Sequence, residues 1–266
     1  MTGLSSLFIM ARVLVQGASR GIGLQFCHHI LKTKPESVVI ATCRNPDTAS
    51  ELSLLNESSF ISRLDVTKEH DVKTVSELVG SQPGGLDLLI NSAGMLHPSG
   101  KGETSLKDVT PEGLLATFQV NTVGPLMMAR YFYPLLASGG AAFGKQAAEK
   151  KQKHNGVLVN MSAKVGSITL NGLGGWYSYR MSKAALNMAT KNLSIELGRG
   201  QKKVICLSLH PGTVNTDLSR PYHKGVPKEQ LFSSEHSVNC LMNIIENATL
   251  EDSGKLFNWS GEAIQY

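Results

Sequence analysis

Cysteine is scarce in this sequence, and its few copies are far apart. The four cysteines, Cys27, Cys43, Cys206 and Cys240, form no CxxC pair. Structural zinc sites and dithiol redox motifs need closely spaced cysteines. The sequence therefore predicts no metal site and no redox centre. Free thiols are typical of proteins in a reducing compartment, and we expect a cytoplasmic protein.

Long apolar runs are also missing. No stretch approaches the roughly 20 apolar residues that a membrane-spanning helix needs, so the sequence predicts no such helix and no membrane partner. Residues 1–10 contain no early basic residue and are too short for a signal peptide with a cleavage site. We expect a loose tail there, and a cryptic organelle signal is the alternative.

Charge is modest as well. Charged residues make up 18% of the chain and hydrophobic residues 41%, which is typical of a globular protein and not of a disordered one. The net charge of +5 is compatible with an anionic ligand, but part of the excess is local, at Lys145, Lys150, Lys151 and Lys153. No RNA-binding or zinc-finger motif accompanies it, so a nucleic-acid partner is not expected.

What the sequence does contain is a regular alternation of short apolar runs and longer helical patterns. The runs that predict strands are 12–16, 37–42, 60–64, 86–90, 156–161, 204–209 and 255–259. The patterns that predict helices are 21–32, 68–79, 111–131, 179–197 and 228–246. This alternation indicates stacked βαβ units. We predict an α/β fold: a Rossmann-type, doubly wound parallel sheet of about seven strands with helices on both faces.

The chain shows no shift in composition that would mark a domain boundary. We therefore predict one domain over residues 11–266 after the tail. Residues 137–156 are rich in glycine, alanine and lysine. We expect them to form a surface loop that extends the end of a helix.

A glycine-rich segment lies between the first predicted strand and the first predicted helix. Residues 17–23 are Gly-Ala-Ser-Arg-Gly-Ile-Gly. Glycines at this spacing allow a sharp turn, a close approach of the backbone to a pyrophosphate, and helix amides that point toward phosphates. In this position the segment predicts a dinucleotide site; an ordinary turn between strand and helix is the alternative.

The end of the second predicted strand distinguishes NADP from NAD. An acidic residue about 20 residues beyond the glycines would bind the ribose 2′-hydroxyl of NAD, whereas a basic one accommodates a 2′-phosphate. Here the strand ends on Arg44, and Arg20 lies within the glycine segment. The nearby acid, Asp47, comes only after Pro46. These residues favour NADP(H), although a merely solvated Arg44 would look the same in sequence.

Tyr179 and Lys183 are the candidate acid–base pair. They lie four residues apart in a helical pattern and so share one face. A phenol with an ordinary pKa near 10 is a poor acid or base at neutral pH, but a neighbouring ammonium stabilises the phenolate. Tyr177 lacks such a partner, because Met181 stands four residues after it.

Taken together, these motifs resemble the short-chain dehydrogenase/reductase superfamily over nearly the whole chain. The matching features, in order, are the glycine segment, Asp65-Val66, Asn91-Ser92-Ala93-Gly94, Asn121, the Tyr179/Lys183 pair and Pro211-Gly212. Residues 41–45, 177–187 and 254–257 are similar to the C-factor and sniffer-like carbonyl reductase subgroup.

The resemblance implies a role for each matching residue. Catalysis would use Tyr179 as acid and base, Lys183 beside it, and Asn121, whose backbone would bind a water that connects Lys183 to solvent. The residues that the resemblance, with Arg44, assigns to cofactor binding are Gly17, Ser19, Arg20, Gly21, Ile22, Gly23, Asp65, Val66, Asn91, Ala93, Gly94, Pro211, Gly212, Val214 and Thr216, together with Tyr179 and Lys183.

Two positions depart from the family pattern. Gln16 stands where the family has threonine, which we interpret as a structural change. The serine that helps the tyrosine to polarise a carbonyl is expected sixteen residues before Tyr179, and that residue is Ala163. Ser162 is adjacent, but alternation along an extended strand would direct it to the opposite face. We assign Ser162 as the candidate substitute, with Ser167 as a second.

The resulting prediction is an NADP(H)-dependent oxidoreductase that interconverts a small carbonyl compound and its alcohol. Trp176, Tyr177, Met95 and Leu96 are candidates to line the substrate side, or simply to pack in the core. Because of Ala163, a cofactor-binding regulatory or signalling protein with impaired catalysis is the alternative. The family resemblance also implies a homodimer or homotetramer formed through the predicted helices 111–131 and 179–197.

Overall fold

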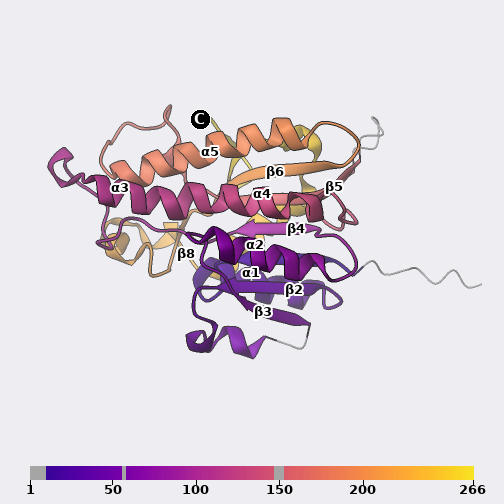
Figure 1. The fold of residues 1–266 in the computed structure, drawn as a ribbon. Helices are drawn as coiled ribbons and strands as arrows, with labels where there is room; N and C mark the ends of the chain where they lie inside the picture. The colour runs from indigo at the N-terminus through magenta and orange to yellow at the C-terminus, as the bar shows by residue number, and fades with distance from the viewer. Residues whose placement is uncertain (1–9, 56–57, 147–152) are drawn as a thin grey trace, which may run out of the picture.

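A computed structural model of the chain describes residues 10–55, 58–146 and 153–266. Its centre is an eight-stranded sheet in the order β10-β9-β6-β5-β4-β1-β2-β3 (Figure 1). Every neighbouring pair in this sheet is parallel except β9 and β10. From β3 to β6 the order is that of a doubly wound Rossmann sheet, which confirms the predicted single-domain α/β fold.

All seven predicted strands are present, with ends that shift by at most two residues. The strands of the main sheet are β1 (Arg12–Gln16), β2 (Val38–Cys43), β3 (Ser59–Arg63), β4 (Leu88–Asn91), β5 (His154–Met161), β6 (Lys203–His210), β9 (Leu256–Asn258) and β10 (Ala263–Ile264). A separate two-stranded sheet pairs β7 (Thr213–Val214) with β8 (Leu231–Phe232). The eighth main strand, β10, is only two residues long and has no alternating pattern, so the sequence did not predict it.

The α-helices are α1 (Gly21–Thr33), α2 (Glu69–Gly80), α3 (Pro111–Phe118), α4 (Gly124–Leu136), α5 (Tyr177–Leu197) and α6 (Ser234–Asn247). Short 3₁₀ turns occupy Pro46–Thr48, Leu52–Leu54, Leu106–Asp108, Lys164–Gly166, Arg220–Gly225, Lys228–Gln230 and Leu250–Asp252. No helix in the described ranges combines the length and the apolar character needed to cross a membrane.

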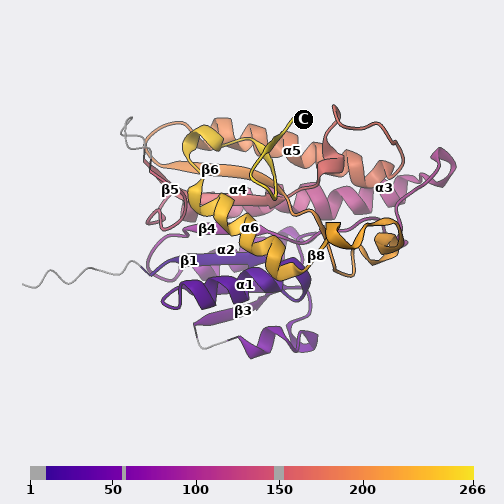
Figure 2. The same ribbon diagram turned by 180° about the vertical axis from the view of Figure 1, so that it is seen from behind.

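The helices cover both faces of the sheet and create two cores. Helices α2, α4 and α5 pack on the face seen in Figure 1, and α1 and α6 pack on the opposite face seen in Figure 2. Strand side chains alternate between these cores: Val13 and Val15 belong to the α1/α6 side, and Leu14 belongs to the other. Because both faces are covered, the strands are apolar almost throughout.

The predicted helix 111–131 is wrong as a single element. It is divided into α3 and α4 by a π-helical turn, Gln119–Val123. Pro125 has no amide hydrogen for the carbonyl four residues earlier, so the regular α-helical hydrogen bonding is interrupted there. Gly124 follows the turn, and a Cβ on it would lie 2.8 Å from Cβ of Val66. The turn therefore lets the backbone of α4 approach the segment after β3.

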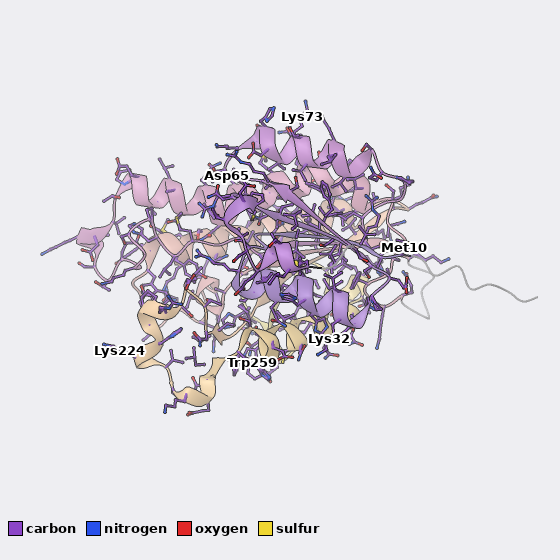
Figure 3. All side chains as sticks on the ribbon, turned by 90° about the horizontal axis from the view of Figure 1, so that it is seen from below. Met10, Lys32, Asp65, Lys73, Lys224 and Trp259 are labelled. Carbon is purple, nitrogen blue, oxygen red and sulfur yellow. The ribbon has the colours of Figure 1, made fainter. Side chains whose placement is uncertain are left out.

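Two further predictions need correction. The helix predicted over 228–246 begins only at Ser234, because the Ser233 side chain accepts a hydrogen bond from the amide of His236 and caps it. The preceding residues form a 3₁₀ turn and β8, in a segment around Lys224 that stands out from the body of the molecule (Figure 3). Residues 137–156 are more than a surface loop: Phe143 is fully buried in the α1/α6 core, and β5 begins at His154.

Some predictions fall on residues outside the described ranges. They concern the tail over residues 1–9 and the lysines at 150 and 151.

Candidate active site

The sheet brings the sequence motifs together at the carboxyl ends of its central strands. Gln16 at the end of β1 pairs in register with Asn91 of β4, and Asn91 pairs with Asn160 of β5. The segments that follow these strands contain the glycine turn, Ala93-Gly94 and Ala163. In doubly wound sheets, ligands bind at this edge, where the strand order reverses. The reversal here lies between β1 and β4.

The glycine turn fits a phosphate-binding role. Gly17 has a φ of +81°, and a Cβ on it would lie 2.6 Å from the Ala93 amide nitrogen. A Cβ on Gly23 would lie 2.2 Å from the carbonyl oxygen of Gly17. Helix α1 follows at once, and the side chain of Arg20 at its N-cap makes no capping hydrogen bond. The first amides of α1 thus have no side-chain cap and can bind an anion.

The departure at Gln16 has a structural explanation. Its side-chain oxygen accepts a hydrogen bond of 3.2 Å from the amide of Ala93. This bond ties the end of β1 to the segment after β4. Asn91 donates to Asn160 at 2.8 Å, but its own Oδ1 is buried without a partner in the described structure. An unpaired buried oxygen beside this edge is available to a ligand.

The opposite wall of the cleft is the segment from Pro211 to Thr216. Gly212 has a φ of +79°, and a Cβ there would lie 2.6 Å from the Phe232 ring. The Pro211 carbonyl accepts a hydrogen bond from Ser237, which fixes the segment on α6. The Thr216 methyl group lies 3.3 Å from where a Cβ of Gly21 would be. The two walls therefore approach each other closely at the glycine turn.

Arg44 and Asp65 follow the strands β2 and β3 at the same edge of the sheet. Arg44 follows β2 directly and is exposed, and Asp47 lies in the 3₁₀ turn beyond it. Burial opposes ionisation of Asp65, but hydrogen bonds from Thr67 and the charge of Arg44 outweigh it and lower the pKa of that carboxyl. Arg44 and Asp65 therefore lie close enough for their charges to interact.

Two of the other predicted cofactor residues have different surroundings. Arg20 is 71% exposed and forms an ion pair of 2.8 Å with Asp217. Val66 is buried and belongs to the core cluster under α2 and α4.

Tyr179 and Lys183 lie together on the buried face of α5. The Lys183 ammonium is 5.7 Å from the centre of the Tyr179 ring and donates a hydrogen bond of 2.7 Å to the carbonyl of Met161. Burial raises the pKa of Tyr179 to about 12 and lowers the pKa of Lys183 to about 7. In the described structure the phenol is thus protonated at neutral pH, and the ammonium is easily deprotonated.

The depressed pKa of Lys183 predicts that this residue destabilises the fold. Between about pH 7 and 10.5 the folded protein binds fewer protons at Lys183 than the unfolded chain does, so the free energy of unfolding rises with pH across this window. Lys183→Met is therefore expected to raise the free energy of unfolding near pH 6 by up to about 5 kcal/mol, since the pKa falls from 10.5 to about 7 and one pKa unit is worth about 1.4 kcal/mol. Urea titrations at pH 6, 8 and 10 measure this gain, which must shrink with rising pH. A gain that does not vary with pH contradicts the interpretation.

Asn121 lies in the π-helical turn and is completely buried. Its side chain accepts from the Met95 amide at 2.8 Å and donates to the Met95 carbonyl at 2.7 Å. It also donates to Ser182 of α5 at 3.0 Å. The side chain thus joins the segment after β4 to the helix that carries Tyr179 and Lys183.

Strand alternation does not separate the two positions as expected, because Ser162 and Ala163 line the same cavity, but their side chains make different contacts. The Ser162 hydroxyl donates a hydrogen bond of 2.6 Å to Oδ1 of Asn187 on α5, so its proton is already in use. Ala163 packs instead in a small cluster with Tyr179 and Leu96. Ser167 donates to the carbonyl of Gln265 and is not directed at the phenol by that bond.

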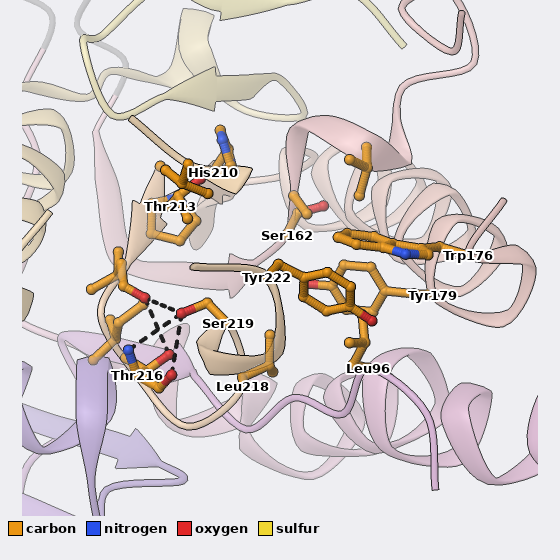
Figure 4. Close-up of a pocket in the computed structure, with 17 residues that line it drawn as sticks. Leu96, Ser162, Trp176, Tyr179, His210, Thr213, Thr216, Leu218, Ser219 and Tyr222 are labelled. Atoms are coloured by element: carbon orange, nitrogen blue, oxygen red, sulfur yellow. Dashed lines mark hydrogen bonds between the residues drawn. The ribbon is translucent and has the colours of Figure 1, made fainter. Parts of the chain in front are cut away.

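Residues of the glycine turn, of the segment from Pro211 to Thr216 and around Tyr179 line one cavity of about 210 Å³ (Figure 4). It is lined by Tyr179 and Ala163, by glycine-turn and Pro211–Thr216 residues, and on the substrate side by Leu96, Val165, Trp176, Leu218, Tyr222 and Val226. Two of the four candidate substrate-side residues, Leu96 and Trp176, are therefore at the cavity, whereas Met95 and Tyr177 are not among its described lining residues.

Three aromatic rings gather on one side of this cavity, as Figure 4 shows for Trp176, Tyr179 and Tyr222. The Trp176 and Tyr222 ring centres are 4.4 Å apart, and the Tyr222 hydroxyl accepts a hydrogen bond of 2.6 Å from the Gly102 amide. Trp176 has a φ of +48°, which is unusual for a bulky residue. Tyr222 was not predicted, because it lies in a turn far from Trp176 along the chain.

The comparisons with known proteins agree with this geometry. The family model described as short chain dehydrogenase matches residues 11–226. C-signal of Myxococcus xanthus is 32% identical over 183 residues, which cover 69% of this chain and 94% of that protein. The NADPH-bound carbonyl reductase from chicken fatty liver superimposes with a TM-score of 0.84 at 30% identity, covering 97% of this chain and 99% of the other. Carbonyl reductase Sniffer of Drosophila melanogaster gives 0.83 at 29% identity, covering 97% and 100%.

Proposed function

Because this chain belongs to the short-chain dehydrogenase family, we propose that it is an NADP(H)-dependent carbonyl reductase. Its substrate would be a small aldehyde or ketone, or the corresponding alcohol. The observation that carries this proposal is the pairing of Tyr179 and Lys183 on one buried helix face, with Tyr179 lining the cavity beside the glycine turn. Consumption of NADPH with a panel of carbonyl compounds tests it.

Each residue of the pair would have one task. The Tyr179 phenol would donate its proton to the substrate carbonyl oxygen, and its raised pKa keeps that proton in place at neutral pH. The Lys183 ammonium would stabilise the phenolate that results. When bound, the nicotinamide would supply the hydride. Asn121 would hold the segment after β4 against α5, so that the phenol keeps its position.

The cofactor would lie between the two walls of the cleft. The glycine turn and the first turn of α1 would hold the phosphates, and Arg20 and Arg44 would neutralise the 2′-phosphate. Asp65, Val66 and the segment from Asn91 to Gly94 would contact the adenosine side. The segment from Pro211 to Thr216 would cover the nicotinamide side.

The proposed preference for NADP(H) predicts a specific effect at Arg44. Arg44→Asp is expected to weaken NADPH binding about 10- to 100-fold more than NADH binding, since a hydrogen bond between charged groups is worth about 1.5–3 kcal/mol. Dissociation constants for both cofactors from fluorescence titration measure this difference. Equal constants in the unmodified protein would contradict the preference itself.

A cofactor-binding signalling protein with impaired catalysis is the second candidate. Ala163 at the usual serine position favours it, and so does the similarity to a relative named C-signal. The buried Tyr179 and Lys183 favour the enzyme. A protein that binds NADPH tightly but reduces no carbonyl compound would support the second candidate.

We also propose self-association into a homodimer or homotetramer through α3, α4 and α5. Large apolar side chains are exposed along these helices, namely Leu115, Leu126, Tyr133, Met181, Met188 and Ile195. An exposed apolar surface of this kind is typical of a protein interface.

A further inference from the structure

An ion-pair cluster connects the two walls of the cofactor cleft. Nη1 of Arg20 lies 2.8 Å from Oδ2 of Asp217. The other oxygen of that carboxylate, Oδ1, lies 2.6 Å from Nη2 of Arg220. One carboxylate thus holds two guanidinium groups, and the Arg20 contact joins residues 197 positions apart in the chain. No other ion pair among the described residues joins the glycine turn to the opposite wall.

The position of this cluster matters because Arg20 is a proposed cofactor residue. Arg20 is the N-cap of α1, inside the turn that fits a phosphate. Asp217 follows Thr216, whose methyl group lies 3.3 Å from where a Cβ of Gly21 would be. Ile22 from one wall and Thr216 from the other line the same cavity. The ion pair therefore places a carboxylate beside the glycine turn, where an anionic cofactor would be bound.

A carboxylate and a phosphate are alternative partners for the same guanidinium group. Both accept hydrogen bonds from the planar fork of an arginine, and both are negatively charged, so they repel each other. NADPH differs from NADH by the 2′-phosphate, which is the group that a basic residue near the turn accommodates. Any free energy that Arg20 gains from Asp217 is lost when the guanidinium turns to that phosphate.

We propose that Asp217 is a specificity-determining residue for the cofactor, which competes with the 2′-phosphate for Arg20 and so limits the preference for NADPH over NADH. The inference rests on the proposed function, because it requires that the cleft binds these cofactors. Arg220 has the opposite influence. It neutralises Asp217 from the other side and weakens the hold of the carboxylate on Arg20.

Asp217→Asn tests the proposal, since asparagine keeps the size of the side chain and removes its charge. The ion pair is exposed, so the effect is a few-fold. We expect the dissociation constant for NADPH to fall about two- to five-fold and that for NADH to change less. Arg220→Met is expected to act in the opposite direction and weaken NADPH binding. In an Arg20→Met background, Asp217→Asn is expected to leave the ratio of the two constants unchanged.

A matched control separates the local contact from a general change in charge. Glu229→Gln removes one negative charge from the exposed 3₁₀ turn Lys228–Gln230, between Asp217 and α6 in the chain, and should leave the ratio of the two constants unchanged. The proposal is overturned if Asp217→Asn changes neither dissociation constant, or if it weakens the binding of both cofactors equally. Equal weakening would mean that the ion pair holds the two walls of the cleft together and supports the binding of either cofactor. If the unmodified protein binds neither cofactor, the proposed function fails, and this inference fails with it.

Discussion

Replacing Tyr179 by phenylalanine is expected to abolish carbonyl reduction while NADPH binding persists. The ring would keep its packing against Trp176 and Ala163, because only the hydroxyl is removed. The proton that the substrate oxygen needs would be gone. General acid–base catalysis contributes about 10²- to 10⁴-fold, so turnover should fall by at least this factor. The measurement is the rate of NADPH oxidation with an accepted aldehyde, together with fluorescence titration of the cofactor.

Tyr177 offers a matched control for this substitution. It is two residues earlier on the same helix, outside the described lining of the cavity, and four residues before Met181 instead of a lysine. Tyr177→Phe should leave turnover unchanged. If Tyr179→Phe retains normal turnover, Tyr179 is not the acid and the proposed chemistry is wrong.

The fold was predictable from the sequence because its strands are buried on both faces. Runs such as 86–90 and 204–209 are continuously apolar, and the glycine segment marks the first turn between strand and helix. The helix ends that were wrong depend on single local interactions. Pro125 interrupts a helical pattern that continues on both sides of it, and the cap at Ser233 overrides the helical pattern before it.

The candidate site was predictable in its motifs and not in its contacts. The spacing of Tyr179 and Lys183 indicated a shared face. The same spacing extends to Asn187, for which no role was predicted. The contact between Arg20 and Asp217 had no signal in sequence, because it joins two walls of a cleft through side chains. Tyr222 was missed for the same reason.

Ala163 is the departure from the family pattern that bears most directly on the proposed chemistry. It occupies the position from which the family's serine would donate a second hydrogen bond to the carbonyl oxygen. Ala163 lines the cavity and packs against Tyr179, so a hydroxyl added there would face the reacting group. Ser162 also borders the cavity, but its proton is bound by Asn187. The hydroxyl of Ser162 must turn away from Asn187 before it can serve a substrate.

Ala163→Ser is therefore expected to raise the turnover number. One hydrogen-bond donor to a developing oxyanion is worth about 10²- to 10³-fold in rate, and this range is the upper limit of the gain. The measurement is the turnover number at saturating NADPH for one aldehyde, compared between the two proteins. Thermal unfolding of both proteins is the control, because the variant must be folded at the assay temperature. A folded variant without any gain would show that a second donor is already present or is not used.

Ser162→Ala and Asn187→Ala identify whether Ser162 is that donor. Both substitutions remove the same buried hydrogen bond, so each is expected to lower the free energy of unfolding by about 1–3 kcal/mol. Only Ser162→Ala also removes the hydroxyl, whereas Asn187→Ala releases it from its partner. If Ser162 supplies part of the missing hydrogen bond, as we propose, Ser162→Ala lowers turnover and Asn187→Ala maintains or raises it. If turnover falls equally in both variants, the Ser162 hydroxyl serves only to connect the end of β5 to α5 through its hydrogen bond with Asn187. If, in addition, Ala163→Ser brings no gain, another donor polarises the carbonyl or the protein does not reduce carbonyl compounds.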